Sequence, residues 1–149
     1  MSIGAICNRK VITTQRNTSV LDAAILMRKH HVGDVVVIET KKEKIVPIGI
    51  VTDRDIVMDV VATALDCKVM TVGDIMVENF LVINKNVDIF VAIKTMTSKG
   101  VRRLPVVDNK GQLVGIATLD DLLLFMTKQF GLLSKLLTRE QKNESSQRR

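Results

Sequence analysis

The stretches Gly49-Ile-Val-Thr-Asp-Arg-Asp-Ile56 and Gly115-Ile-Ala-Thr-Leu-Asp-Asp-Leu122 are two copies of one pattern, a hydrophobic run that ends in Thr-x-x-Asp. The likeness continues around them: residues 2–7 align with residues 71–76 at a shift of 69, and the shift falls to 66 after residue 38. The difference falls in the polar stretch 39–47, where a surface hairpin tolerates a change of length. The chain therefore consists of two tandem repeats, and this decides the fold.

Each repeat is predicted to run strand, helix, strand, strand, helix. The expected strands are 11–14, 35–38 and 47–51 in the first repeat, and 81–83, 104–107 and 113–117 in the second. The expected helices run from a Thr18 or Ser19 cap to His30, where Gly33 ends the helix, from Asp53 to about Ala62, from 87 to 99, and from 119 to 129.

These elements predict an α+β fold. The domains are repeat 1 (2–62), a linker (63–70), repeat 2 (71–130) and a charged tail (131–149), which is partly helical or disordered. A three-stranded sheet with two helices would leave one apolar face bare. We therefore expect the two repeats to pack sheet to sheet about a pseudo-twofold axis.

Composition narrows the class of protein. The net charge is +6, and residues 131–149 hold five Lys or Arg against two Glu, so the excess is concentrated in the tail. Trp and Tyr are absent, which weighs against the stacking platforms of single-strand nucleic-acid binders. No apolar run reaches 18 residues, and the first residues lack the order of a signal peptide, so a cytoplasmic protein without a membrane partner is expected. Cys7 and Cys67 lack metal-ligand spacing and are expected to be reduced thiols.

With these repeats, the chain resembles a CBS-domain pair, also called a Bateman module. The resemblance rests on residues 3–6 (Ile-Gly-Ala-Ile) and 72–76 (Val-Gly-Asp-Ile-Met), on Met27 and Met96, on residues 101–108 (Val-Arg-Arg-Leu-Pro-Val-Val-Asp), and on the two Gly-Ile-x-Thr-x-x-Asp segments. It covers about residues 2–130, and no other recognisable domain is attached.

The Thr-x-x-Asp segments have a structural and a functional interpretation. The structural one is a capping box at a helix start. The functional one is a nucleotide site at the same helix start. Free amides at a helix N-terminus bind phosphate, and a carboxylate one turn later can accept hydrogen bonds from ribose hydroxyls. The resemblance implies that Asp55 and Asp121 bind ribose and that Thr52 and Thr118 bind phosphate.

The resemblance also implies an adenine pocket in each repeat. Its lining would be Cys7, Ile12, Val32 and Ile50 in repeat 1, and Met76, Leu81, Val101 and Ile116 in repeat 2. Core packing is an equal alternative for each of these apolar residues.

Basic residues make the two sites unequal. Arg102 and Arg103 are expected to reach phosphates in the Asp55 site, whereas Asp34 would repel phosphate in the Asp121 site. Arg54, with Asp120 as its counterpart, partly reverses this bias. We therefore expect the Asp55 site to bind nucleotide more tightly.

The sequence contains no HExxH, GxSxG or Walker pattern and no nucleophile–base pairing, so an enzyme is not expected. The leading hypothesis is a homodimeric regulatory module that senses AMP, ADP or ATP, or else NAD or S-adenosylmethionine, and modulates an unidentified protein. It needs no obligatory cofactor and no metal. One alternative is a dimerisation or adaptor protein with vestigial nucleotide sites, and a less favoured one is a nucleic-acid binder.

Overall fold

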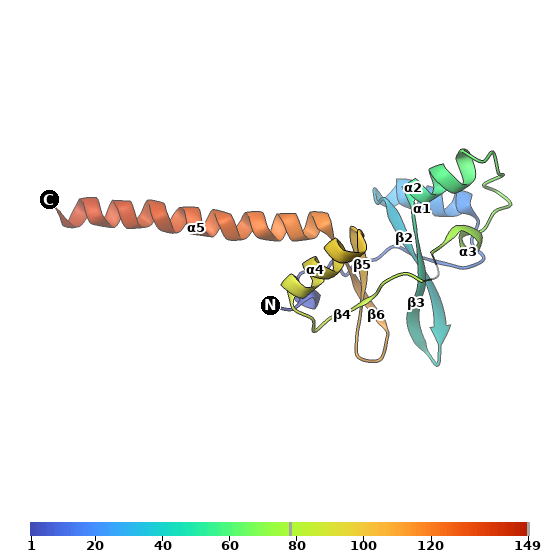
Figure 1. The fold of residues 1–149 in the computed structure, drawn as a ribbon, viewed down its shortest axis with the longest axis horizontal. Coiled ribbons are helices and arrows are strands. Elements are labelled where there is room, and N and C mark those ends of the chain that lie inside the picture. Colours follow the sequence, from blue (N-terminus) through green and yellow to red (C-terminus); the bar gives the residue numbers. More distant parts are fainter. Residues whose placement is uncertain (78, 149) are drawn as a thin grey trace.

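The computed structural model describes residues 1–77 and 79–148, and Figure 1 shows a two-lobed body from which one long helix projects. The lobe of repeat 1 contains β1 (Thr13–Gln15), α1 (Val20–His30), β2 (Asp34–Lys41), β3 (Lys44–Thr52), α2 (Asp53–Ile56) and the π-helix η2 (Val57–Val61). The lobe of repeat 2 contains β4 (Ile83–Asn84), α4 (Ile89–Lys99), β5 (Arg103–Val107), β6 (Leu113–Thr118) and the start of α5 (Leu119–Gln147). Two short helices, η1 (Ile3–Ala5) and α3 (Val72–Ile75), lie at the start of the two repeats.

The two lobes have the same sheet topology. In the described residues there are two three-stranded sheets, ordered β1-β2-β3 and β4-β5-β6, each with one parallel and one antiparallel pair. A register shift occurs at the same relative place in both sheets, between Val37 and Ile38 and between Val106 and Val107. The predicted α+β fold of two repeats, each with a small sheet, is confirmed.

Most predicted element boundaries agree with the structure. Ser19 caps α1 by accepting a hydrogen bond from the Asp22 amide (3.0 Å). The first helix ends before Gly33, because His31 takes the left-handed conformation (φ 54°) at its C-terminus. Gly100 ends α4 in the same conformation (φ 63°), as expected.

The first segments of the two repeats are exchanged between the lobes. Amides of Ile3 and Gly4 donate to the Val87 and Lys85 carbonyls (2.8 and 2.9 Å), so the N-terminal segment packs on the lobe of repeat 2. The amides of residues 72 and 73 donate in the same way to the carbonyls of residues 18 and 16, in repeat 1. Ile3 is therefore buried in the core of repeat 2, and Val72 in the core of repeat 1.

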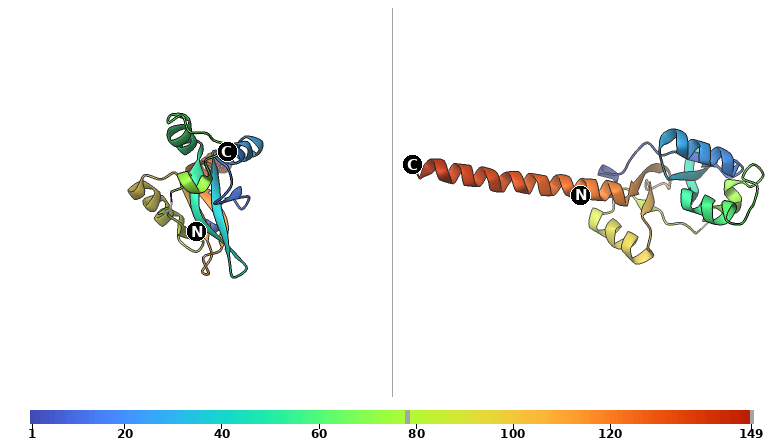
Figure 2. Two further views of the ribbon diagram at one scale, coloured as in Figure 1. Left: turned by 90° about the vertical axis from the view of Figure 1, so that its right-hand side faces the viewer. Right: turned by 90° about the horizontal axis from the view of Figure 1, so that it is seen from above.

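The last helix departs from the prediction. It was expected to end at Gln129, with a separate stretch from Gly131, but α5 continues to Gln147. Gly131 lies inside it, because Gly weakens a helix by about 1 kcal/mol without breaking it. Figures 1 and 2 show that this helix extends away from both lobes. None of the helices in the described ranges is long and apolar enough to cross a membrane.

Candidate functional site

Both Thr-x-x-Asp segments form capping boxes. At α2, the Asp55 amide donates to Thr52 Oγ1 (3.2 Å), and the Thr52 amide donates to Asp55 Oδ2 (2.8 Å). At α5, the Asp121 amide donates to Thr118 Oγ1 (3.1 Å), and the Thr118 amide donates to Asp121 Oδ2 (3.1 Å). These bonds satisfy amides that a helix N-terminus leaves free. The structural interpretation is thus confirmed, while the ribose and phosphate roles stay predictions.

The two capping boxes differ in one bond. The Thr118 hydroxyl donates to Asp121 Oδ2 (2.7 Å). Among the described residues, no corresponding bond from the Thr52 hydroxyl to Asp55 is present. All of the capping bonds to the two carboxylates go to Oδ2.

A cleft of about 260 Å³ lies beside Asp121, and we call it the Asp121 cleft. Its walls come from four places in the chain: the first segment of repeat 1, the turn from α1 into β2, the start of β5 and the start of α5. The lining residues are Asn8, His31, Val32, Gly33, Asp34, Arg102, Arg103, Thr118, Leu119, Asp120 and Asp121.

The two arginines lie close to both capping boxes. Arg102 and Arg103 line the Asp121 cleft, but Arg103 also lines a cleft with Ile50 of repeat 1, and a Cβ added to Gly33 would lie 3.0 Å from Arg103 Nη2 and 3.2 Å from Asp53 Oδ2. Their expected role at the Asp55 site therefore stays a prediction. In the sheet register, Arg103 is paired with Thr118 between β5 and β6, so the arginines lie next to the cap of their own repeat. Arg54 is exposed on α2 and is not among the residues that line this cleft.

Arg103 is paired with an acidic residue of the other repeat. Its Nε lies 2.6 Å from Asp34 Oδ2, and the two side chains are 31% and 15% exposed. Asp34 is itself paired with Thr52 between β2 and β3, so this ion pair connects the two strand ends that lead into the capping boxes. Burial raises the pKa of the Asp34 carboxyl, and the neighbouring Arg103 opposes that rise without cancelling it. The expected repulsion by Asp34 is therefore partly offset by Arg103.

A second cleft, of about 350 Å³, shares Arg103 with the Asp121 cleft, and we call it the Ile50 cleft. It brings Ile50 of repeat 1 together with Leu81 and Val101 of repeat 2. The remaining lining residues are Val77, Asn79, Phe80, Lys99, Arg103 and Pro105. Thr52 and Asp55 are not in this lining.

The predicted adenine-pocket residues are distributed over the two clefts differently from their order along the chain, and their role toward adenine stays a prediction. Each cleft draws on both repeats: Val32 of repeat 1 lies in the Asp121 cleft, while Leu81 and Val101 of repeat 2 lie in the Ile50 cleft. Alignment of a repeat assigns residues by their order along the chain. The clefts form where the two lobes meet, so their walls mix the two copies.

Cys7 and Met76 are exchanged between the predicted pockets. Cys7 belongs to the core of repeat 2, and a Cβ added to Gly115 would lie only 2.6 Å from its Sγ. Met76 belongs to the core of repeat 1, where a Cβ on Gly49 would lie 2.6 Å from its Sδ. The cause is the crossing of the first segments of the two repeats. Burial raises the pKa of the Cys7 thiol, which keeps it protonated and unreactive.

The other predicted pocket residues occupy the core edges of their own repeats. Ile12 packs against the core of repeat 1, and Ile116 is buried in β6, where it forms a bridge to Asn8. Asn8, His31 and Lys99 line the clefts but were missed. Their positions depend on the exchanged segment and on the lobe interface, and no local sequence pattern marks them.

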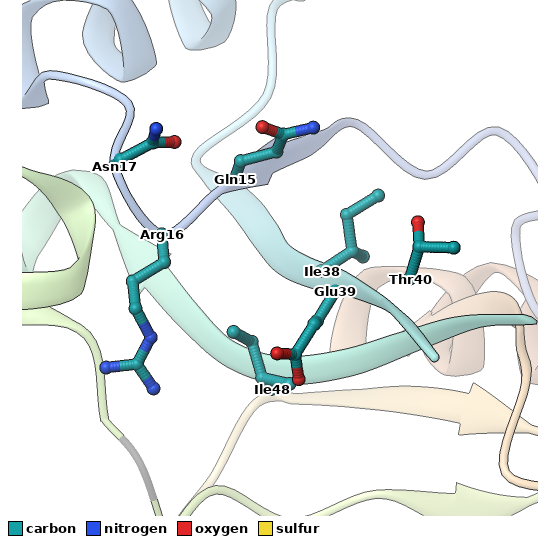
Figure 3. A pocket seen from close by; sticks show the side chains of 7 residues that line it. All are labelled: Gln15, Arg16, Asn17, Ile38, Glu39, Thr40 and Ile48. Atoms are coloured by element: carbon teal, nitrogen blue, oxygen red, sulfur yellow. The ribbon is translucent and has the colours of Figure 1, made fainter. Parts of the chain in front are cut away.

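A hollow of about 470 Å³ lies elsewhere, on the sheet of repeat 1 (Figure 3). Its side chains come from β1 and the turn after it, from β2 and from β3. None of the predicted site residues is among its lining residues. Among the described residues, no group of three or more His, Cys, Asp or Glu side chains is placed to hold a metal ion.

Comparison with known proteins finds relatives of this chain by sequence. The chain is 37% identical over 123 residues to an uncharacterised protein of Methanopyrus kandleri, covering 83% of this chain and 61% of that protein. It is 35% identical over 113 residues to the CBS domain-containing protein YhcV of Bacillus subtilis, covering 76% of each. The chain thus spans less than two thirds of the length of the first relative.

Solved structures share the fold. A CBS domain protein of Pyrobaculum aerophilum, complexed with AMP, has a TM-score of 0.73 at 24% identity and covers 82% of this chain and 90% of its own. A CBS domain pair in complex with 5′-methylthioadenosine and S-adenosyl-L-methionine has a TM-score of 0.73 at 24% identity, with 87% and 98% covered. The CBS domain itself matches residues 3–62 and 72–128, so this chain belongs to the CBS domain family.

Proposed function

We propose that this chain is a regulatory module that binds an adenine nucleotide in the Asp121 cleft and thereby modulates another protein. The observation that carries the proposal is the lining of this cleft: a capped helix N-terminus, the Asp121 carboxylate and Arg102 converge on one opening. Structures with the same fold are complexes with AMP and with S-adenosyl-L-methionine, so the fold accommodates adenosine-containing ligands. The ligand choice in this chain rests on its own residues.

The arginine positions reverse the expected ranking of the two sites. The Asp55 site was ranked first because Arg102 and Arg103 were assigned to it. Arg103 lines both clefts, whereas Arg102 lines the Asp121 cleft and not the Ile50 cleft, so we rank the Asp121 site first.

The charge of the cleft selects among nucleotides. Three carboxylates (Asp34, Asp120 and Asp121) face two guanidinium groups (Arg102 and Arg103), so the lining carries about one net negative charge at neutral pH. Every further phosphate adds repulsion. We expect AMP to bind more tightly than ADP, and ADP more tightly than ATP. S-Adenosylmethionine, which carries a cationic sulfur, and NAD belong in the same test.

The test is thermal unfolding of the full chain with each of these ligands. A ligand at 100 times its dissociation constant should stabilise the fold by about 2.7 kcal/mol. Asp121→Asn should lower AMP affinity at least tenfold. Its matched control, Asp120→Asn, removes the same charge from the same cleft and should keep or improve the affinity. Equal losses in both variants would contradict the ribose role.

The second candidate is an adaptor with vestigial sites. It is favoured by the closed bonding of the α5 cap, where the Thr118 hydroxyl is already donated to Asp121. The adaptor predicts that none of the ligands shifts the unfolding temperature. A pull-down of binding proteins with and without AMP separates the two functions, because regulation requires that the nucleotide changes the amount of partner retained.

A further inference from the structure

We infer that an anionic ligand in the Ile50 cleft weakens the binding of a nucleotide in the Asp121 cleft, and the reverse, because both ligands need the guanidinium group of Arg103. Arg103 lines both clefts. The inference rests on the proposed function, since it concerns how binding in the Asp121 cleft is regulated.

Arg103 lies where the two repeats meet. At the shift of 69 residues that relates the first halves of the repeats, Arg103 is the counterpart of Asp34. These two counterparts form an ion pair, in which Arg103 Nε lies 2.6 Å from Asp34 Oδ2. Counterpart residues of two repeats can touch only at the interface between the lobes. The guanidinium group therefore lies between the two halves of the molecule.

The guanidinium group is also close to the helix start of each repeat. The backbone of Arg103 is paired with that of Thr118, the cap of α5. Its Nη2 atom lies 3.0 Å from the point that a Cβ on Gly33 would occupy, and Asp53 Oδ2, at the start of α2, lies 3.2 Å from the same point. The side chain is 31% exposed, so it can turn without leaving a closed core. One arginine can thus reach toward either site.

Backbone hydrogen bonds connect the ion pair to both helices. The Asp53 amide donates to the Gly33 carbonyl (3.0 Å), and the Leu119 amide donates to the Arg102 carbonyl (2.9 Å). Gly33 and Arg102 directly precede the two residues of the ion pair. A ligand that moves Arg103 therefore also acts on the residues that hold the first turns of α2 and α5.

The Ile50 cleft suits a ligand that has both an apolar part and an anionic group. Phe80, Leu81 and Val101 are among its apolar walls, and the charged residues of its described lining are Lys99 and Arg103. Its volume of about 350 Å³ is within the range of small-molecule sites. AMP has an apolar ring and a phosphate, so it can serve as the probe for both clefts.

The charges of the two clefts explain why sharing Arg103 produces antagonism. When Arg103 turns into the Ile50 cleft, the Asp121 cleft holds Arg102 against three carboxylates and repels a phosphate more strongly. When Arg103 turns into the Asp121 cleft, the Ile50 cleft holds Lys99 as its cation. Linkage requires that each ligand weakens the other by the same factor.

Titration calorimetry with AMP tests this coupling in the full chain. Lys99→Glu disables the Ile50 cleft and Asp121→Asn disables the Asp121 cleft, so each variant gives the affinity of the other cleft alone. In the native chain, the second AMP should bind about tenfold more weakly than the same cleft binds it in the single-cleft variant.

Neighbouring arginines provide a matched pair of variants. Arg102 and Arg103 carry the same charge, but Arg102 does not line the Ile50 cleft. When the titrations are repeated in an Arg103→Gln background, the penalty on the second AMP should fall below threefold. In an Arg102→Gln background, the Asp121 cleft should bind AMP more weakly while the tenfold penalty remains. A purely structural role of Arg103 would lower both affinities and leave the penalty unchanged.

A double variant guards against a loss of the fold. Arg103→Gln leaves the Asp34 carboxylate without its cation, whereas Asp34→Asn together with Arg103→Gln removes both charges of the pair. The double variant should show the same loss of the penalty, and its thermal unfolding checks that it is folded.

The outcomes separate this inference from the proposed function. Two AMP molecules that bind the native chain independently, or a penalty that persists without Arg103, would overturn the inference and leave the proposed function standing. The same holds if the native chain binds one AMP and Asp121→Asn binds none, because the Ile50 cleft then takes no ligand. A native chain that binds no AMP would overturn both.

Discussion

Replacing Asp34 by Asn tests whether the ion pair between the repeats restrains the nucleotide site. Asn keeps the size of the side chain but removes the charge that holds Arg103, whose Nε lies 2.6 Å from Asp34 Oδ2. Both residues line the Asp121 cleft. In the variant, the Arg103 guanidinium is free to turn toward a phosphate, and the cleft loses one of its three carboxylates.

The size of the effect follows from Coulomb's law. A unit charge about 6–8 Å from a phosphate, at an effective dielectric constant of 20–40, contributes about 1–3 kcal/mol. Asp34→Asn should therefore increase AMP affinity by about 5- to 100-fold. The gain should shrink as salt is added, because the partly exposed Arg103 is screened.

Titration calorimetry with AMP measures this gain, and Asp59→Asn serves as the control. Asp59 is exposed and is not among the residues that line the Asp121 cleft, yet its substitution changes the net charge by the same amount. Weaker binding by Asp34→Asn, or an equal gain in both variants, would refute the reasoning. Unchanged binding would show that neither Asp34 nor Arg103 acts on the ligand.

The pH dependence gives a second measurement on the same variant. Burial raises the pKa of Asp34 in the folded protein, so this carboxyl holds its proton to a higher pH than in the unfolded chain. Its contribution to stability is then full below the unfolded pKa and is lost as pH rises through the folded pKa. Relative to the native protein, Asp34→Asn should gain stability across that window, and thermal unfolding between pH 3 and pH 7 would detect it.

Three further predictions concern the fold. A Cβ on Gly49 would lie 2.6 Å from Met76 Sδ, so Gly49→Ala should cost about 1–3 kcal/mol in urea unfolding, and the double variant with Met76→Ala should lose less than the sum of the two single losses. The amide of Gln112 lowers the pKa of Asp108 by hydrogen bonding, so Asp108 contributes stability that is lost as pH falls through the folded pKa, and Asp108→Asn should flatten the acid limb of the unfolding curve. Gly131 has open space at its Cβ position within α5, so Gly131→Ala should raise helix stability by about 0.5–1 kcal/mol in a circular-dichroism melt, and an unchanged melt would contradict this.

The parts of the fold that follow local rules could be predicted. The helix starts at Thr52 and Thr118 were identified because a cap needs only a hydroxyl, an acidic residue three positions later and an apolar run. The end of α5 was placed too early, because a single Gly is a weak signal. The leucines after Gly131 continue the helical pattern, and α5 runs on through them to Gln147.

The sequence predicted which residue types the site contains but not which of these residues share a cleft. Asp121 and Thr118 were named from their motif, and Arg102 and Arg103 from their charge. Their meeting in one cleft depends on the pairing of Arg103 with Thr118 across β5 and β6, which is a register between strands. Register is set by turns and by the burial of one face, and a repeat alignment does not contain it.

By itself, the sequence determined the duplicated α+β fold, the two capped helix starts and the family, because each depends on patterns within a short stretch or on the repetition of such stretches. The tertiary structure alone decided which side chains share a cleft. It crossed Cys7 and Met76 into the opposite lobes, placed both arginines beside Asp121 and paired Arg103 with Asp34. The physical reason is that each lobe completes its core with a segment from the other half of the chain. Contacts between residues so far apart in sequence arise only when the two repeats pack together.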